Sequence, residues 1–319
     1  MTVPRIVSLL PSATEIISAL GFADALVGRS HECDFPPEVE DLPVLTAPLI
    51  DASGSSREIH SRVEARLSQG ISVYRVDTEA LQSLSPTHVV TQVHCEVCAV
   101  SLSDVRGALG PDPDLRLVAL GASTVTEVLA DIERVAASLD SPRRGTSLTR
   151  ALSARMSAIA TEAALAARCP RVATIEWLAP PMAAGNWIPE LVEMAGGENL
   201  FGQAGRHSPW LAPDALARAN PDVLVVFPCG FSLERTEAEA NLLREIPGFE
   251  DLAAVANGSV YLCDGNQFFN RPGPRLVETL EILAEILHPE RFSFGWEGIG
   301  WKRWGRSLSA LSRQLSAGR

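Results

Sequence analysis

The chain has 319 residues, of which 46% are hydrophobic, and its formal net charge is -12. This length is about twice that of a typical domain, so two domains are expected. The acidic balance argues against a nucleic-acid partner, which would need basic stripes on the protein. No apolar run reaches the roughly 18 residues that a transmembrane helix requires.

The first residues do not have the pattern of a secretory signal peptide, because Pro11 and Glu15 interrupt the apolar run that follows Arg5. A cytoplasmic protein is therefore expected. The alternative is a periplasmic or extracellular protein whose leader has been removed. In a large chain of this kind, the six cysteines are expected to be reduced.

The N-terminal half alternates strand and helix patterns. A helix is predicted to start at Ser12, with Glu15 as its capping-box partner, and to stop at Gly21. A second capping box, Thr124 with Glu127, starts a helix that runs to about residue 140. The remaining helices are predicted at 55–70, near 78–84 and near 101–108, and the strands at 5–10, 25–30, 73–76, 88–92 and 116–121. This alternation implies a parallel sheet covered on both faces.

Pro142 breaks this pattern, and one long helix is predicted from about Thr146 to Arg168. Some 21 residues at 1.5 Å each give a rod of roughly 32 Å. A helix of that length between two α/β halves predicts a strut that restricts hinge motion.

The C-terminal half restarts the alternation, with predicted strands at 171–177, near 223–228 and at 260–264, and a closing helix over 274–287. Glutamates on that helix, including Glu278, Glu281 and Glu285, are expected to be solvated. The basic tail at 291–319 contains three tryptophans and is expected to pack onto a lobe.

The two halves resemble each other. Residues 5–28 and 171–202 share the order of apolar stretch, loop, helix and glycine stop, and residues 79–92 align with 214–228, which places Pro86 on Pro221. The expected organisation is an N-terminal α/β lobe (1–143), a linker helix (144–169), a C-terminal α/β lobe (170–290) and a packed tail (291–319). Two similar lobes suggest a ligand held between them.

Ligands of open parallel sheets bind beyond the carboxyl ends of the strands. Polar and aromatic residues recur at these positions in both halves, and they are the candidate ligand contacts: Pro11, Ser12, His31, Glu176, Trp177, Asn186, Trp187, His207, Trp210, Phe231, Phe269 and Arg271. The aromatic rings suit a large planar ligand, although ordinary core packing is the alternative for each ring. His207 is a candidate axial ligand for a metal, and a local hydrogen bond is its alternative role.

The segments HEC (31–33) and HCEVC (94–98) contain a possible soft-metal site. Cys95 and Cys98 form a Cys-x-x-Cys pair, and Cys33 with His31 or His94 would complete a tetrahedron for zinc or iron. A redox dithiol is the second possibility. Packing of small residues at strand ends is the third. No catalytic constellation is found, since neither a Gly-x-Ser-x-Gly elbow nor a phosphate-binding glycine loop is present.

Several segments resemble the cobalamin-binding branch of the substrate-binding proteins of ABC importers. The resemblance covers about residues 4–290 and is carried by RIVSLLPSATEIISALG, GRSHECDFP, TQVHCEVCAVS, PPMAAGNWIPELVEMAGG, HSPW and RPGPRLVETLEILAEILHP. It implies two Rossmann-like lobes with parallel sheets joined by one long helix, as in class III periplasmic binding proteins and helical-backbone metal receptors. The HEC and HCEVC segments resemble a leaderless subgroup of that family.

The resemblance implies a non-enzymatic binder of a cobalamin-like corrinoid or another metal chelate, with an ABC importer permease as a possible partner. A cytoplasmic carrier or sensor of the same ligand is an equivalent possibility. The alternative is a metal- or thiol-dependent enzyme that uses the His31, Cys33, Cys95 and Cys98 cluster. A third possibility is a binding protein for a metal-free organic solute.

Overall fold

The computed structural model describes residues 3–69, 71–93, 100–110 and 112–305, and the chain divides into two compact units. The first unit runs to Ser157 and also contains Arg271–Val277. The second unit contains Ala158–Asn270 and the chain from Glu278 onward. Each unit has its own sheet and its own hydrophobic core.

The main sheet of the first unit has four parallel strands in the order β2-β1-β5-β6. Their bounds are β1 Ile6–Ser8, β2 Leu26–Arg29, β5 His88–Gln92 and β6 Arg116–Leu120. All five residues of β5 are buried, as expected for a central parallel strand covered on both faces. The predicted parallel sheet of the N-terminal half is present, and its strand bounds agree with the apolar runs within one or two residues.

The prediction that residues 73–76 continue this parallel series was wrong. These residues form β4 (Tyr74–Val76), which pairs antiparallel with β3 (Thr46–Pro48) in a separate two-stranded sheet. None of the three residues of β4 is fully buried, which is typical of a strand with a solvated face rather than of a buried parallel one.

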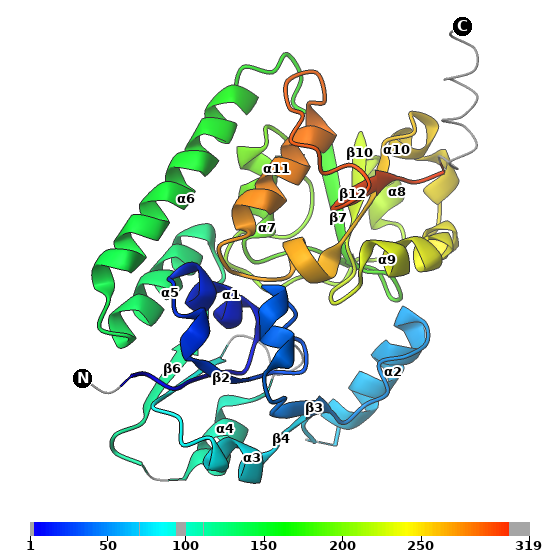
Figure 1. Ribbon diagram of the computed structural model, residues 1–319. Coiled ribbons are helices and arrows are strands. Elements are labelled where there is room, and N and C mark those ends of the chain that lie inside the picture. Colours follow the sequence, from blue (N-terminus) through cyan, green and yellow to red (C-terminus); the bar gives the residue numbers. More distant parts are fainter. Residues whose placement is uncertain (1–2, 70, 94–99, 111, 306–319) are drawn as a thin grey trace, which may run out of the picture. The chain divides into compact units, whose positions relative to one another are not determined.

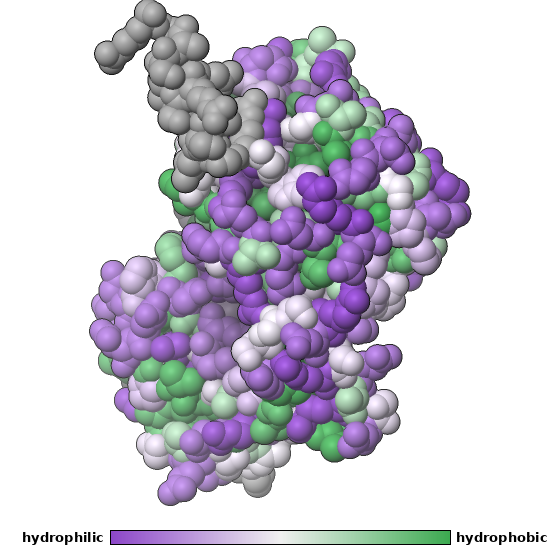
Figure 2. Space-filling view, turned by 90° about the vertical axis from the view of Figure 1, so that its right-hand side faces the viewer, coloured by the Kyte–Doolittle hydropathy of each residue, from purple (hydrophilic) through white to green (hydrophobic). Residues whose placement is uncertain are grey.

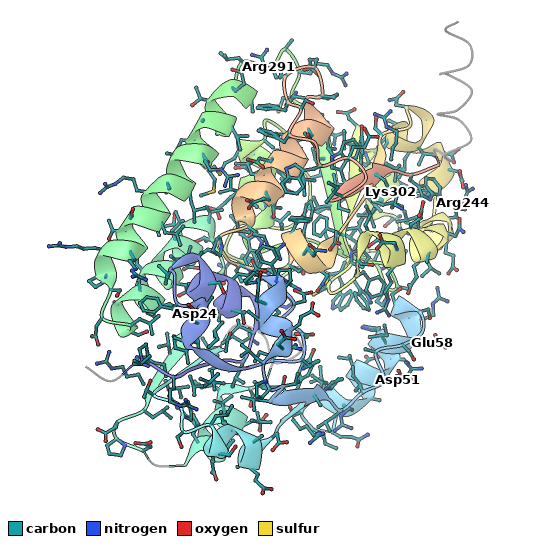
Figure 3. All side chains as sticks on the ribbon, in the orientation of Figure 1. Asp24, Asp51, Glu58, Arg244, Arg291 and Lys302 are labelled. Carbon is teal, nitrogen blue, oxygen red and sulfur yellow. The ribbon has the colours of Figure 1, made fainter. Side chains whose placement is uncertain are left out.

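The helices of the first unit begin mostly at side-chain caps. The capping box predicted at Thr124 and Glu127 is present at α5, and Ser55 with Glu58 forms a second box at α2. Figure 3 labels Glu58 near Asp51 at the beginning of α2. Helices α1 and α5 pack against each other (Figure 1). The bounds are α1 Pro11–Ala19, α2 Ser56–Leu67, α3 Thr78–Ser83, α4 Leu102–Leu109 and α5 Val125–Ser138, with 3-10 turns η1 Ala23–Ala25 and η2 Pro37–Asp41.

The long helix α6 spans Pro142–Ala163, so it starts earlier and ends earlier than predicted. Pro142 does not break the pattern but is the first helical residue, where its missing N–H would have no partner in any case. The buried face of α6 includes Leu152, Met156 and Ile159, which are three or four residues apart. The chain passes from the first unit to the second within α6, after Ser157.

The second unit contains a six-stranded mixed sheet in the order β12-β11-β10-β7-β8, with β9 paired to β7. The pairs among β7, β9, β10 and β11 are parallel, whereas β8 and β12 are antiparallel to their neighbours. The bounds are β7 Arg171–Trp177, β8 Met182–Ala183, β9 Glu198–Asn199, β10 Val223–Val226, β11 Val260–Cys263 and β12 Trp301–Arg303.

Helices cover both faces of this sheet (Figure 1). On one face, apolar residues of β7, β10 and β11 pack against α8, α9 and α10. This cluster includes Leu216 of α8, Leu233 of α9 and Phe249 of η4. Figure 1 shows α7 and α11 on the other face. The bounds are α7 Ile188–Met194, α8 Ala215–Ala219, α9 Leu233–Glu239, α10 Ala253–Ala256 and α11 Leu276–Leu287, with the 3-10 helices η3 Ala240–Glu245 and η4 Phe249–Asp251 and the π-helix η5 Gly265–Phe269.

The repeat seen in the sequence has a structural counterpart. In the first unit the short helix α3 precedes β5, and in the second the short helix α8 precedes β10. The aligned prolines, Pro86 and Pro221, each lie between helix and strand. Each half therefore uses the same helix–strand order to build an inner strand of its parallel sheet.

The glutamates of α11 correct another expectation. Glu281 and Glu285 were expected to be solvated but are 8% and 5% exposed. Glu285 accepts hydrogen bonds from the backbone N–H of Trp296 at 3.1 Å and from the indole of Trp301 at 3.0 Å, and Glu281 accepts one from the indole of Trp296 at 3.1 Å. These carboxylates are buried because the tryptophan segment supplies the donors that a buried anion needs.

Residues 301–303 form β12, which pairs with β11. Lys302 of this strand forms an ion pair with Glu237 of α9 (Figure 3 labels Lys302). On the face drawn in Figure 2, apolar residues lie in small groups among hydrophilic ones. Over the described ranges, no helix combines the length and the apolar character needed to cross a membrane.

Candidate functional site: the strand ends of each unit

The carboxyl end of β1 leads directly into α1 and its ion-pair cluster. Pro11 is the first residue of α1 and Leu10 is its N-cap, without a side-chain cap. The predicted capping box of Ser12 and Glu15 was therefore wrong, because Ser12 already lies inside the helix. Ser12 is buried, and a Cβ atom at Gly273 would lie 3.5 Å from its carbonyl oxygen.

The carboxylate of Glu15 instead binds two arginines from the far end of the sequence. It accepts hydrogen bonds from Arg271 Nη1 at 3.1 Å, from Arg275 Nη2 at 2.6 Å and from Arg275 Nε at 3.0 Å. Arg271 also binds both carboxylate oxygens of Asp34, at 2.5 and 2.8 Å, and the guanidinium of Arg275 lies 4.1 Å from the ring centre of Phe35. Paired, hydrogen-bonded charges of this kind are the form in which ions tolerate burial.

Arg271 is only 4% exposed. Burial lowers its pKa, but the hydrogen bonds and charges of Asp34 and Glu15 outweigh that effect and raise the pKa overall. The guanidinium thus remains charged and is engaged by two carboxylates of the first unit. Its predicted contact with a ligand stays a prediction.

His31 follows β2 at the same edge of the sheet. Its backbone N–H donates to Thr46 Oγ1 at 3.1 Å, and its ring Nδ1 lies 2.7 Å from the same oxygen. The ring is 5.5 Å from that of Tyr74, centre to centre. Burial, and then the charge of Arg29, lower the pKa of His31, so the neutral imidazole is favoured.

The next two residues of this loop are also shifted toward their neutral forms. Burial raises the pKa of Glu32 to about 7, against a smaller opposing effect of the Arg271 charge. Burial also raises the pKa of the Cys33 thiol to about 11, although Thr14 Oγ1 donates a hydrogen bond to its sulfur at 3.0 Å. A buried, protonated thiol is a poor metal ligand, because metals bind the thiolate.

Only two of the four residues of the predicted metal site, His31 and Cys33, lie among the described residues. Cys95 and Cys98 lie outside the described residues, as does His94. In the part of the chain that the structure covers, no group of three or more His, Cys, Asp or Glu residues is arranged to hold a metal ion. The four-residue cluster therefore stays a prediction.

In the second unit, Glu176 and Trp177, which were predicted to contact a ligand, are the last two residues of β7. The Oε2 atom of Glu176 accepts a hydrogen bond from Ser208 Oγ at 2.7 Å, and that hydroxyl in turn accepts one from Gly185 N at 3.1 Å. Trp177 is partly exposed, and its ring packs edge-on against Phe231 at 5.4 Å. The indole Nε1 of Trp177 is buried without a hydrogen-bond partner, and such unpaired donors are uncommon in folded proteins.

The other predicted rings near this edge are buried. Trp187 donates from Nε1 to the carbonyl oxygen of Phe269 at 3.0 Å, and Phe269 stacks on Phe227 at 4.3 Å. Phe231 is 2% exposed and carries the guanidinium of Arg235 at 3.9 Å from its centre. These contacts are those of core packing, and ligand contact by Trp187, Phe231 and Phe269 stays a prediction.

Two neighbouring segments of the second unit contain the remaining predicted residues. Asn186 adopts a left-handed conformation with φ 53°, and its N–H donates to the carbonyl of Arg206 at 2.7 Å. The side-chain oxygen of Asn186 is buried and has no hydrogen-bond partner in the structure. His207 and Trp210 are exposed in the loop between β9 and α8, and His207 Nδ1 lies 3.0 Å from its neighbour's carbonyl oxygen. His207 thus makes the local bond that was its alternative role.

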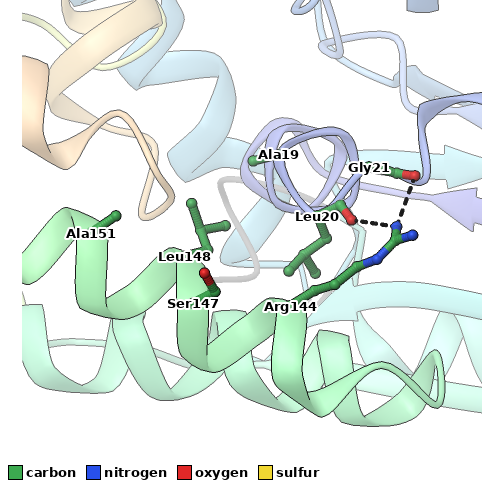
Figure 4. Close-up of a pocket in the computed structure, with 7 residues that line it drawn as sticks. All are labelled: Ala19, Leu20, Gly21, Arg144, Ser147, Leu148 and Ala151. Carbon is green, nitrogen blue, oxygen red and sulfur yellow. Dashed lines mark hydrogen bonds between the residues drawn. The ribbon is translucent and has the colours of Figure 1, made fainter.

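A pocket of about 630 Å³ lies elsewhere in the first unit (Figure 4). It is lined by Ala19, Leu20, Gly21, Arg144, Ser147, Leu148 and Ala151. Arg144 donates to the carbonyl oxygens of Leu20 and Gly21 at 2.9 and 3.2 Å and lies 4.7 Å from the ring of Phe22. The pocket is at the C-terminal end of α1, and its one charged group already stabilises that helix end.

Thr46, Asp34 and Arg275 also belong to the site in the first unit and were not predicted from the sequence. Thr46 was missed because strand β3 was not predicted. The arginines bracket a Pro-Gly-Pro turn in RPGPR (271–275), and two arginines held by a rigid turn are a signal for a carboxylate partner.

Comparisons with known proteins agree with this architecture. An uncharacterized ABC transporter substrate-binding lipoprotein of Bacillus subtilis (strain 168) is 23% identical over 298 residues, which cover 90% of this chain and 81% of the relative. A vitamin B12-binding protein of Vibrio cholerae is 23% identical over 294 residues, covering 89% and 88%. The periplasmic heme-binding protein of Roseiflexus sp. RS-1, in its apo form, has a TM-score of 0.66 and 26% identity, covering 90% of this chain and 99% of that chain.

Residues 6–267 match the family described as "Periplasmic binding protein". This match and the solved structures confirm the predicted resemblance and the predicted α/β fold class. They also confirm the prediction of a binding protein rather than an enzyme. Because the match extends over most of its length, this chain belongs to the periplasmic binding protein family.

Proposed function

We propose that this protein binds and releases a metal chelate of the tetrapyrrole class, either a cobalamin-like corrinoid or a haem. The names of its relatives support that class, since one binds vitamin B12 and another binds heme. Both ligands are large and planar and hold a metal with axial coordination positions. The shared chemistry is therefore a flat metal macrocycle.

The observation that carries the proposal is the kind of group found at the strand ends of each unit. The first unit presents the neutral imidazole of His31 beside Tyr74. The second presents the carboxylate of Glu176, the partly exposed Trp177 and the exposed Trp210. An imidazole suits the metal, and indole faces suit the apolar ring system. That both units contact one ligand stays a prediction.

We also propose that an importer permease is the partner of this protein. The relative from Bacillus subtilis is a substrate-binding lipoprotein of an ABC transporter, and this supports the alternative location outside the cytoplasm over the cytoplasmic one. The proposed role is delivery of the chelate to the transporter.

The test is a titration of the purified protein with aquocobalamin and, separately, with hemin. The expected result is a shifted visible spectrum for one chelate, a stoichiometry near one, and comigration of the chelate with protein on a sizing column. Zinc chloride and metal-free protoporphyrin serve as controls for bare-metal and porphyrin-only binding. If neither chelate comigrates, and native mass spectrometry finds a metal-free organic solute instead, the proposal is wrong.

A further inference from the structure

His31 of the first unit makes two hydrogen bonds to a single hydroxyl, one from its backbone and one from its ring. The backbone N–H of His31 and its ring Nδ1 both contact Thr46 Oγ1, at 3.1 and 2.7 Å. Thr46 belongs to β3, whereas His31 follows β2, so the ring is held by a separate element of the fold. The neighbouring Tyr74 ring, 5.5 Å away, limits rotation of the imidazole further.

The hydrogen-bond directions define the tautomer of this ring. The hydroxyl of Thr46 has one hydrogen, which it donates to Ser30 Oγ at 3.0 Å. Toward His31, Thr46 Oγ1 is therefore an acceptor, and Nδ1 must carry the ring hydrogen. The Nε2 atom then holds the lone pair. Within the described part of the chain, the hydrogen bonds of the His31 ring all involve Nδ1.

We propose that Nε2 of His31 is an axial ligand of the metal in the bound chelate, and that Thr46 is the positioning residue that sets its tautomer. The inference rests on the proposed function. It restricts the ligand to chelates with an exchangeable axial position. On binding, a metal–nitrogen bond replaces a metal–water bond, the water leaves, and the oxidation state of the metal is unchanged. The hydrogen bond made by one ring nitrogen of a histidine determines which nitrogen is available to bind a metal.

His207 is the rival imidazole. Its Nδ1 lies 3.0 Å from the carbonyl oxygen of Ser208, which can only accept, so its Nε2 also holds a lone pair. This contact is to its own chain neighbour, however, and the side chain is exposed. His31 is held more firmly, because its two bonds and its aromatic neighbour come from other elements.

The experiment compares His31→Gln with the matched control His207→Gln, using hemin and aquocobalamin as probes. Wild-type protein is expected to show imidazole coordination in the visible spectrum and, with hemin, in the EPR spectrum. His31→Gln should still comigrate with the chelate but lose that signature, and added imidazole should restore it. Cyanocobalamin, whose cyanide occupies the exchangeable axial position, should give no imidazole signature with either wild type or His31→Gln.

A second pair of variants tests the positioning role. Thr46→Ser keeps the hydroxyl and should keep the signature, whereas Thr46→Val should lower chelate affinity by about tenfold or more. An unchanged signature in His31→Gln, or its loss in His207→Gln, would overturn the inference while leaving the proposed function intact. Failure of the wild-type protein to bind either probe would instead refute the proposed function itself.

Discussion

The guanidinium of Arg271 lies 3.1 Å from the carboxylate of Glu15, although 256 positions separate the two residues in the sequence. Glu15 is 3% exposed and binds Arg275 as well. The segment Arg271–Val277 thereby belongs to the first unit, although the residues before and after it in the sequence belong to the second. Removing the shared carboxylate would leave two buried cations without a common partner.

Glu15→Ala is therefore expected to lower the free energy of unfolding by roughly 3–5 kcal/mol, because an unpaired buried charge is costly. The measurement is urea denaturation followed by circular dichroism. Asp24→Ala, an exposed acidic change in the same region (labelled in Figure 3), is the control and should cost less than about 1 kcal/mol. Equal effects of the two changes would show that the ion-pair cluster does not stabilise the fold.

The second prediction concerns Glu285 of α11, which binds Trp296 and Trp301. Glu285 accepts hydrogen bonds from Trp296 N and Trp301 Nε1 while almost fully buried. Glu285→Ala should cost roughly 2–4 kcal/mol, since several donors lose their partner, and should red-shift the tryptophan emission. Glu290→Ala, on an exposed side chain, is the control. A normal emission spectrum in Glu285→Ala would mean that the segment is held by other contacts.

Strands and helix starts could be predicted where they depend on residues close together in the sequence. The buried strands followed from short apolar runs, and the start of α5 followed from Thr124 and Glu127, three residues apart. The same capping pattern failed at Ser12, because Pro11 starts α1 one residue earlier and Glu15 has stronger, charged partners. A local pattern cannot reveal that a partner lies more than 250 residues away.

The site could be predicted only as a set of positions. The rule that parallel strands end at one edge placed His31, Glu176 and Trp177 correctly just beyond β2 and at the end of β7. It could not show that Phe231 and Phe269 are buried, because packing depends on neighbours from other strands. Nor could it find Thr46, whose strand β3 is short and pairs with the equally short β4.

The pH dependence of stability gives a third prediction. His88 is buried at the start of β5, and its Nε2 donates to the carbonyl oxygen of Ser138 at 2.9 Å. Burial is the largest cause that lowers its pKa. Because the unfolded imidazole binds a proton more readily than the folded one, stability is present above the unfolded pKa of about 6.5 and is lost as pH falls below it. His31 acts in the same direction.

His88→Gln should therefore reduce the loss of unfolding free energy between pH 7.5 and pH 5.5, even if it lowers stability at every pH. The measurement is urea denaturation at three pH values in that window. His207→Gln is the control, because its exposed ring loses little hydration on folding. An unchanged pH slope in His88→Gln would assign the acid sensitivity to other groups.

The last prediction concerns Gly185, which lies between β8 and α7 and packs against the loop that carries His207 and Trp210. A Cβ atom at Gly185 would lie 2.4 Å from the carbonyl oxygen of Arg206 and 2.8 Å from Ser208 N. Both are backbone atoms, so the loop itself must move. Gly185→Ala is expected to cost about 1–3 kcal/mol through overpacking and to weaken chelate binding by displacing the Ser208 hydroxyl from Glu176.

Gly107→Ala is the matched control, because Gly107 lies inside α4 and an added Cβ meets no atom of the described residues within 4 Å. Alanine there should stabilise the helix by roughly 0.5–1 kcal/mol and leave chelate affinity unchanged. Urea denaturation and the aquocobalamin and hemin titrations measure both effects. If Gly185→Ala lowers stability but binds the chelate with wild-type affinity, the loop of His207 and Trp210 lies outside the binding surface, and ligand contact in the second unit is confined to the end of β7.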